Sequence, residues 1–265
     1  MIMVQNMSRI QNDPDIPWWE RTWRERESLL VKTFGEMIPP NTVRAFYWDD
    51  IAVRIPGGCA MTFSMNYNAR VAFLTLGHGL TQPISSREMH SVDNRSGYGW
   101  EFGVVTDDNN EWRFDILYQL MTYVRQSGHR IESGHRVPFS FFRTSNGQLS
   151  AALGKPSALD DARRLSDIAS MVFWPLATLS RDLVTSTGRF GILIGTTISA
   201  VELDLAKQTS SAHLILLLYR SGIGQLSNPS RGPVINSAEG RRNWAEIKSL
   251  PVTEVECQLR SYMKG

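Results

Sequence analysis

Apolar positions in the second half of the chain change abruptly from one periodicity to another. Residues 190–218 read FGILIGTTISAVELDLAKQTSSAHLILLL, and a β-branched apolar run at residues 191–197 ends at Ser199. Ser199 and Glu202 have the spacing of a capping box, in which each side chain satisfies a free main-chain N–H at the start of a helix. The pattern predicts a buried strand that runs directly into a helix.

A second strand is predicted at residues 97–106 from strict alternation. Large apolar side chains recur at every second position, whereas glycine and Glu101 occupy most of the positions between them. Alternation with period two is typical of a strand that has one buried face and one face at least partly exposed to water. We therefore expect Trp100 and Phe102 to point into the core from the same face.

A helix is predicted at residues 110–126, immediately after that strand. Its apolar positions share one face, and Ser127 and Gly128 provide an end to it; the positions are Phe114, Leu117, Leu120, Met121 and Val124. We expect this amphipathic helix to pack across the sheet that contains residues 97–106.

The remaining elements suggest one α+β (α/β) domain at residues 18–265, after a flexible lead at residues 1–17. Residues 18–34 fit one face of a helix, and no linker divides the chain that follows. After Tyr219 the sequence is polar and rich in Gly and Pro to about Arg242, and a weak helix or strand signal closes it. The strands predicted at 43–48 and 51–55, joined by a turn at Asp49 and Asp50, and at 69–76 are expected to form one mixed or antiparallel sheet with residues 97–106. Residues 168–174 are a further β-like run.

Composition narrows the class of protein. The 28 basic and 26 acidic residues nearly cancel, without the basic cluster of a nucleic-acid-binding domain. The sequence contains neither an apolar run of transmembrane length nor the apolar core of a signal peptide. Cys59 and Cys257 are too far apart in sequence for a zinc-knuckle spacing, so we expect two free, buried thiols. These features predict a cytoplasmic protein that binds neither nucleic acid nor membrane.

Familiar catalytic motifs are absent from the sequence. It has no Gly-x-Ser-x-Gly, His-Glu-x-x-His or phosphate-loop pattern, and the glycines at 97–103 have the spacing of a packed strand rather than of a dinucleotide site. His129 and His135 are six residues apart with Glu132 between them, which is not a metal-ligand spacing. We expect no metal and no cofactor. His213, in the apolar segment AHLILLL, is expected to be half-buried with its hydrogen bonds satisfied.

Several segments, taken together and in order, resemble the suppressor of fused domain family. The resemblance covers roughly residues 23–218 and suggests a bacterial stand-alone member. The matching segments are RVAFLTLGHGLTQP at 70–83, GYGWEF at 97–102, LMTYVRQ at 120–126, SGHRV at 133–137 and residues 193–205.

The resemblance implies a compact protein-binding domain. Eukaryotic relatives sequester zinc-finger transcription factors by clamping a peptide as an added strand between this domain and a second one, whereas the present sequence is expected to end after the first. Tyr123 keeps the aromatic residue of the clamp, but His135 stands where the family has an acidic residue. The residues expected to contact a protein partner are Tyr123, Ser133, Gly134, His135, Arg136 and Val137.

The resulting hypothesis is a non-catalytic domain that binds another protein, in particular an immunity protein that neutralises a cognate toxin. Two alternatives stay open at this point. One is a regulatory adaptor that binds a transcription factor, and the other is an enzyme of unrecognised type that uses His129, Glu132 and His135. A simpler interpretation of the site also stays open, in which Tyr123 belongs to the core and residues 133–137 form only a turn.

Overall fold

The computed structural model describes most of the chain after residue 17. The described residues are 18–34, 43–45, 59–65, 70–76, 95–107, 116–117, 120, 123–124, 129–139, 168–177, 179, 182–186, 188–228 and 230–262. The predicted lead at 1–17 and the predicted strand at 51–55 lie outside these residues.

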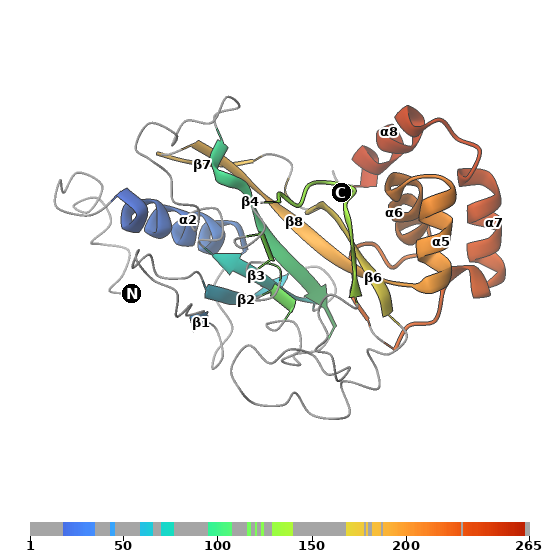
Figure 1. Cartoon of the computed structure of the whole chain (residues 1–265), viewed down its shortest axis with the longest axis horizontal. Helices are drawn as coiled ribbons and strands as arrows, with labels where there is room; N and C mark the ends of the chain where they lie inside the picture. Colours follow the sequence, from blue (N-terminus) through green and yellow to red (C-terminus); the bar gives the residue numbers. More distant parts are fainter. Residues whose placement is uncertain are drawn as a thin grey trace.

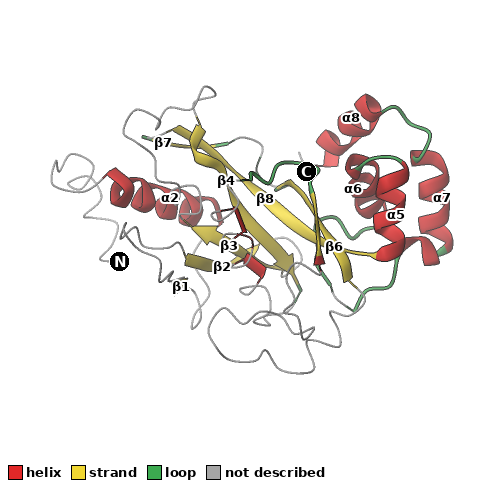
Figure 2. Cartoon of the chain, viewed as in Figure 1, coloured by secondary structure: helices red, strands yellow, loops and turns green. Residues whose placement is uncertain are grey.

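The described residues form a mixed sheet of eight strands, in the order β1-β2-β3-β4-β8-β6-β5, with β7 also paired to β8 (Figures 1 and 2). Strands β4 and β8 are parallel, and the other pairs are antiparallel. The α+β class and the mixed sheet are therefore confirmed. The strands are β1 (Val43–Ala45), β2 (Cys59–Met65), β3 (Arg70–Leu76), β4 (Arg95–Thr106), β5 (Arg136–Pro138), β6 (Ile168–Pro175), β7 (Leu183–Thr185) and β8 (Gly188–Ser199).

The helices lie in two separate places. Helix α2 contacts β2, β3 and β7, and the group α5 to α8 lies beside β6 on the opposite side of the molecule (Figure 1). Helical residues 116–117, 120 and 123–124 agree with the helix predicted at 110–126. The bounds are α2 (Trp18–Phe34), α5 (Ala200–Gln208), α6 (Ser211–Arg220), the short 3-10 helix η5 (Val234–Asn236), α7 (Ala238–Ile247) and α8 (Val252–Tyr262).

Both faces of the central strands are buried. On one face, Phe102 of β4 packs with the helical residues Ile116, Leu117, Leu120 and Val124, and Trp100 packs against the same cluster, as predicted. The opposite face was predicted to be partly wet, and that prediction is wrong. Helix α2 covers it, and Arg26 of α2 forms an ion pair with the fully buried Glu101. Burial lowers the pKa of Arg26, against the opposing effect of the charge of Glu101.

The direct passage from strand to helix is confirmed at Ser199. The Ser199 side chain accepts a hydrogen bond from the Glu202 N–H at 3.3 Å, and the Glu202 carboxylate accepts one from the Ser199 N–H at 2.9 Å. Two free N–H groups at the start of α5 are thereby satisfied. His213 of α6 is fully buried rather than half-buried, but its ring is satisfied as predicted, with Nε2 at 2.9 Å from the Leu250 carbonyl and Nδ1 at 2.7 Å from the Ser210 hydroxyl.

The strand glycines have the packing role that their spacing predicted. A Cβ on Gly191 of β8 would lie 2.4 Å from the Trp100 ring on β4. Gly99 has a φ of +79°, and the β4–β8 register shifts between Arg95 and Trp100. Glycine therefore allows the two strands to approach closely and one of them to bend.

Two sequence predictions need correction, whereas the predicted hairpin of 43–48 with 51–55 falls partly outside the described residues; within them, β1 pairs with β2. The polar stretch was expected to extend to about Arg242, but helix α7 begins within it at Ala238, and helix α8 follows. Both helices bury only a few residues along one narrow side, so the periodic pattern of apolar residues in their sequences is weak. Cys257 on α8 is exposed, not buried.

Candidate functional site

The predicted contact segment is a tight turn that leads into β5. Gly134 has a φ of +84°, a conformation that glycine adopts at little cost. The Gly134 N–H donates to the Phe173 carbonyl at 2.8 Å, and the Phe173 N–H donates to the His135 carbonyl at 2.9 Å. The turn is therefore fastened to β6 through its own main chain.

A second attachment comes from helix α6. The Ser211 hydroxyl, in the first turn of that helix, donates to the Gly134 carbonyl at 2.6 Å. Further along, the Ser170 hydroxyl of β6 donates to the Val137 carbonyl at 2.9 Å. Because both ends of the segment are hydrogen-bonded to regular elements, its shape is set by the fold.

β5 is the last strand on its side of the sheet within the described residues. Arg136 stands opposite Val172 of β6, one position beyond His135, whose carbonyl accepts a hydrogen bond from the Phe173 N–H. In an antiparallel ladder the next position directs its N–H and C=O away from the partner strand. The main-chain groups of Arg136 therefore face the outer edge of the sheet.

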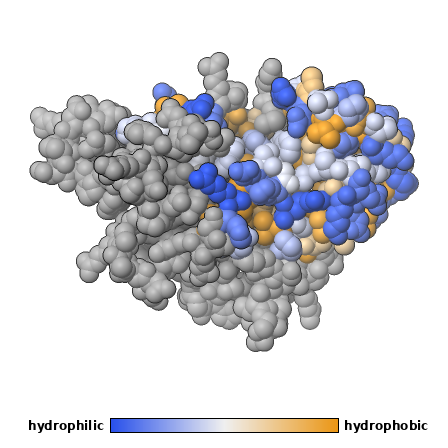
Figure 3. All heavy atoms as spheres, turned by 45° about the horizontal axis from the view of Figure 1, so that its top comes forward, coloured by the Kyte–Doolittle hydropathy of each residue, from blue (hydrophilic) through white to orange (hydrophobic). Residues whose placement is uncertain are grey.

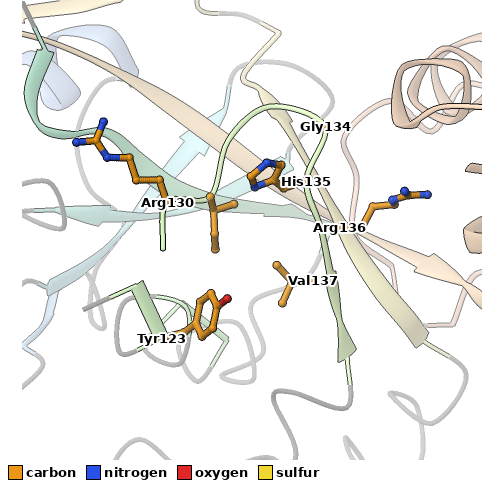
Figure 4. A pocket seen from close by; sticks show the side chains of 7 residues that line it. Tyr123, Arg130, Gly134, His135, Arg136 and Val137 are labelled. Carbon is orange, nitrogen blue, oxygen red and sulfur yellow. The ribbon is translucent and has the colours of Figure 1, made fainter. Parts of the chain in front are cut away.

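A pocket of about 320 Å³ lies against this segment (Figure 4). Its lining combines an aromatic side chain from the 116–124 helical region with the turn and β5: Tyr123, Arg130, Ile131 and residues 134–137. Ile131 is only 4% exposed, and Tyr123 and Val137 pack against the same core cluster as Phe102. The floor is therefore apolar and continuous with the core.

The polar lining consists mainly of hydrogen-bond donors. Arg130 and Arg136 are exposed, and Figure 4 shows their guanidinium groups extending to opposite sides. The Glu132 N–H donates to Nδ1 of His135 at 3.2 Å. In the neutral ring, Nε2 must therefore carry the hydrogen.

Most of the predicted contact residues meet at this pocket. Tyr123, Gly134, His135 and Val137 line it, whereas the exposed Ser133 does not. Arg136 lines it too, but its side chain points away from Tyr123 and Val137 (Figure 4), because alternate residues of a strand face opposite sides of the sheet.

Two lining residues, Arg130 and Ile131, were missed by the sequence analysis. The matching segment SGHRV begins at Ser133, so the resemblance gave no reason to extend this part of the site towards Arg130. The apolar Ile131 between the polar residues His129 and Glu132 was the available signal, because an isolated apolar residue in a polar turn often anchors that turn to the core.

The groups of the alternative enzyme hypothesis make other contacts. Nδ1 of His129 lies 3.5 Å from the Tyr123 hydroxyl, and Nδ1 of His135 is taken by the main chain of Glu132. Neither contact joins a histidine to a nucleophile or a carboxylate. Among the described residues, no three His, Cys, Asp or Glu side chains are grouped in a way that could hold a metal ion.

The surface around these elements is of mixed character. In Figure 3, hydrophilic side chains cross the middle of the described surface as a band, with smaller hydrophobic patches on either side. No helix within the described ranges combines the length and the apolar character needed to cross a membrane.

Comparison with solved structures places the fold beside Suppressor of Fused. A chain of the Sufu–Fu complex has a TM-score of 0.53 at 12% identity, over 94% of this chain and 98% of that one. A protein described as a SUFU homolog from Neisseria gonorrhoeae has a TM-score of 0.52 at 14% sequence identity, and the match covers 80% of this chain and 96% of that one. Drosophila Suppressor of Fused has a TM-score of 0.50 at 15% sequence identity, and the match covers 67% of this chain. It covers 42% of the Drosophila chain, so the present chain spans about two fifths of that protein's length.

At the level of sequence, no family model matches the chain, and a search of curated proteins finds no match. The identities to the solved structures are low, so the likeness is one of fold. The chain has a Suppressor-of-Fused-like fold, which confirms the resemblance drawn from its sequence segments.

Proposed function

We propose that this chain is a non-catalytic protein-binding domain whose contact face is the Tyr123 pocket and the adjoining edge of β5. The observation that carries the proposal is the pocket itself, in which an apolar floor with a polar rim lies beside Arg136 of β5, whose main-chain groups face outwards. An apolar floor favours a partner side chain, and outward-facing main-chain groups on a strand favour a partner main chain.

Preorganisation supports the same proposal. The turn at residues 132–135 is already hydrogen-bonded to β6 and α6. A partner would therefore meet a surface that is already in its bound shape and would bind without the cost of ordering it. One of the proteins with a similar fold is a component of a protein complex, that of Sufu with Fu.

The experiment is a titration of a captured partner against two tyrosine variants. The partner is isolated from the native host by affinity capture and identified by mass spectrometry. Tyr123→Ala should weaken its binding by at least about tenfold, since truncating an aromatic residue at the centre of an interface typically costs that much or more. Tyr262→Ala on α8 is the control, because it makes the same change outside the pocket.

Circular dichroism must show that both variants are folded. If the parent and a folded Tyr123→Ala variant bind the partner with equal affinity, the contact face does not include the Tyr123 pocket. Turnover of a small substrate that is abolished by His135→Ala would replace the binding function with an enzymatic one.

The finer part of the proposal concerns the identity of the partner, which we take to be a toxin that this chain neutralises. The likeness to a bacterial protein over 96% of that protein's length supports a bacterial setting. Co-expression supplies the test: the captured partner should arrest growth alone and lose this effect beside the parent chain. A partner that is harmless to cells would contradict the immunity role and leave the binding role intact.

A further inference from the structure

We infer that the segment that binds in the Tyr123 pocket is acidic, with carboxylates on both sides of an apolar side chain. The inference rests on the proposed function and adds the chemistry of the partner. It follows from the two arginines beside the pocket, Arg130 and Arg136, and from its apolar floor.

Neither arginine is neutralised by a described residue of the chain. The described residues give Arg130 and Arg136 no ion pair and no side-chain hydrogen bond, and both are exposed. Elsewhere in the described ranges, arginines meet carboxylates within the fold, as in the pairs Arg26–Glu101, Arg220–Glu246 and Arg231–Glu202. The guanidinium groups beside the pocket therefore keep their donors available to a second molecule.

The placement of the two charges sets the pattern of the partner. Figure 4 shows Arg130 to one side of Tyr123 and Val137, whereas Arg136 extends away from them on the far side of β5. His135 adds the Nε2–H donor, and Glu132 is the one carboxylate at residues 129–139. An extended segment along the β5 edge directs successive side chains to opposite faces, so a segment with an apolar residue over the floor and acidic residues before and after it would reach both guanidinium groups.

A protein segment fits this surface better than a nucleic acid does. The net charge of the chain is only +2, and a phosphate backbone is normally held by a longer basic stripe. Guanidinium groups also bind carboxylates through paired, charge-assisted hydrogen bonds. A pocket of about 320 Å³ lies at the small end of the range for ligand sites, about 300–1,000 Å³, which suits one or two side chains.

The test uses two labelled peptides and fluorescence anisotropy. In the first peptide a central leucine is flanked by two glutamates on each side, and in the second the glutamates are replaced by glutamines. We expect the glutamate peptide to bind about tenfold more tightly at low ionic strength, and the difference to shrink as salt screens the exposed charges. A single-stranded oligonucleotide of equal charge is the third probe.

Three charge-matched variants locate the effect. Arg130→Gln and Arg136→Gln should each weaken the glutamate peptide about two- to fivefold, the range for exposed ion pairs, and should leave the glutamine peptide unchanged. Arg242→Gln removes the same charge from an exposed position on α7 and should change neither.

Equal binding of the two peptides would overturn the inference. So would tighter binding of the oligonucleotide, an equal loss in the Arg242 variant, or no measurable binding of the glutamate peptide up to about 1 mM. Binding measurements with the captured partner distinguish failure of this inference from failure of the proposed function. A partner that is lost with Tyr123→Ala but unaffected by the double arginine variant would leave the binding function standing and remove only the acidic segment.

Discussion

Arg231 and Arg136 show two opposite environments for the same side chain. Arg231 donates to the Glu202 carboxylate at 3.0 Å and to the Thr197 carbonyl at 3.1 Å. Glu202 is buried and also accepts from the Val234 N–H at 3.0 Å. Arg136 is exposed at the sheet edge and has no acceptor within the described structure.

The pKa of Glu202 shows that its contacts with Arg231 and the main chain stabilise the charged carboxylate. Burial alone would raise this pKa, but the hydrogen bonds and charge of Arg231, with those from the main chain, outweigh it and lower the pKa. An arginine that donates to a buried carboxylate and to a carbonyl thus joins its own segment to α5 and β8. An arginine without acceptors among the described residues keeps its donors for a partner. We therefore expect Arg231 to stabilise the fold and Arg136 to contribute to binding.

The largest effect is expected from Glu202→Ala. It leaves the partly buried Arg231 without its carboxylate and removes half of the capping box, so the free energy of unfolding should fall by about 3–5 kcal/mol. Urea denaturation measures this. Asp204→Asn on the same helix removes a carboxylate that is paired with Lys207 at the surface, and should cost no more than about 1 kcal/mol. Similar losses of unfolding free energy in both variants would show that the buried pair of Glu202 with Arg231 stabilises the fold no more than the surface pair does.

Acid should weaken the fold through the same carboxylate. Because the pKa of Glu202 is lower in the folded chain than its ordinary value of 4.5, the unfolded chain takes up the proton first as pH falls. The stabilisation is complete above pH 4.5 and is lost as pH falls through the folded-state value. Urea denaturation over a pH series should show a steeper acid loss for the parent than for Glu202→Gln. Identical slopes would contradict this role.

An intermediate effect is expected at the turn beside the pocket. Gly134→Ala forces a non-glycine residue into a φ of +84°, although its Cβ would lie at an ordinary 3.8 Å from Ser211 and Trp174. The loss should therefore be about 1–3 kcal/mol, from backbone strain alone. Gly232→Ala is the control, because a Cβ there meets nothing within 4 Å. A neutral Gly134→Ala would mean that the turn can relax.

The smallest effect on stability is expected at the pocket rim. The double change of Arg130→Gln and Arg136→Gln should leave the free energy of unfolding within about 0.5 kcal/mol of the parent, since neither side chain has a partner among the described residues. Arg231→Gln should cost several times more. A large loss in the double variant would show that the two arginines serve the fold and not a partner.

The sequence predicted features that depend on neighbouring residues and missed those that depend on distant ones. The capping box at Ser199 and Glu202 could be predicted because its members are three residues apart, but the partner Arg231 could not. Likewise, alternation placed Trp100 and Phe102 on one face, whereas Arg26 and α2 covered the face expected to be wet.

The same limit applies to the candidate site. The resemblance brought Tyr123 together with residues 133–137, and the structure places most of them around one pocket. It could not show that Arg136 points away from Tyr123, because strand β5 was not predicted and its alternation was unknown. The binding role of these residues stays a prediction.

Amide hydrogen exchange of the chain, free and with its captured partner, tests the central claim most directly. We predict that exchange at residues 129–138 slows on binding, above all at the Arg136 amide, which faces the edge of β5 with which no described strand pairs. The amides of α7 and α8 should exchange as in the free chain. Protection confined to α7 and α8, with none at residues 129–138, would contradict the assignment of the Tyr123 pocket as the contact face.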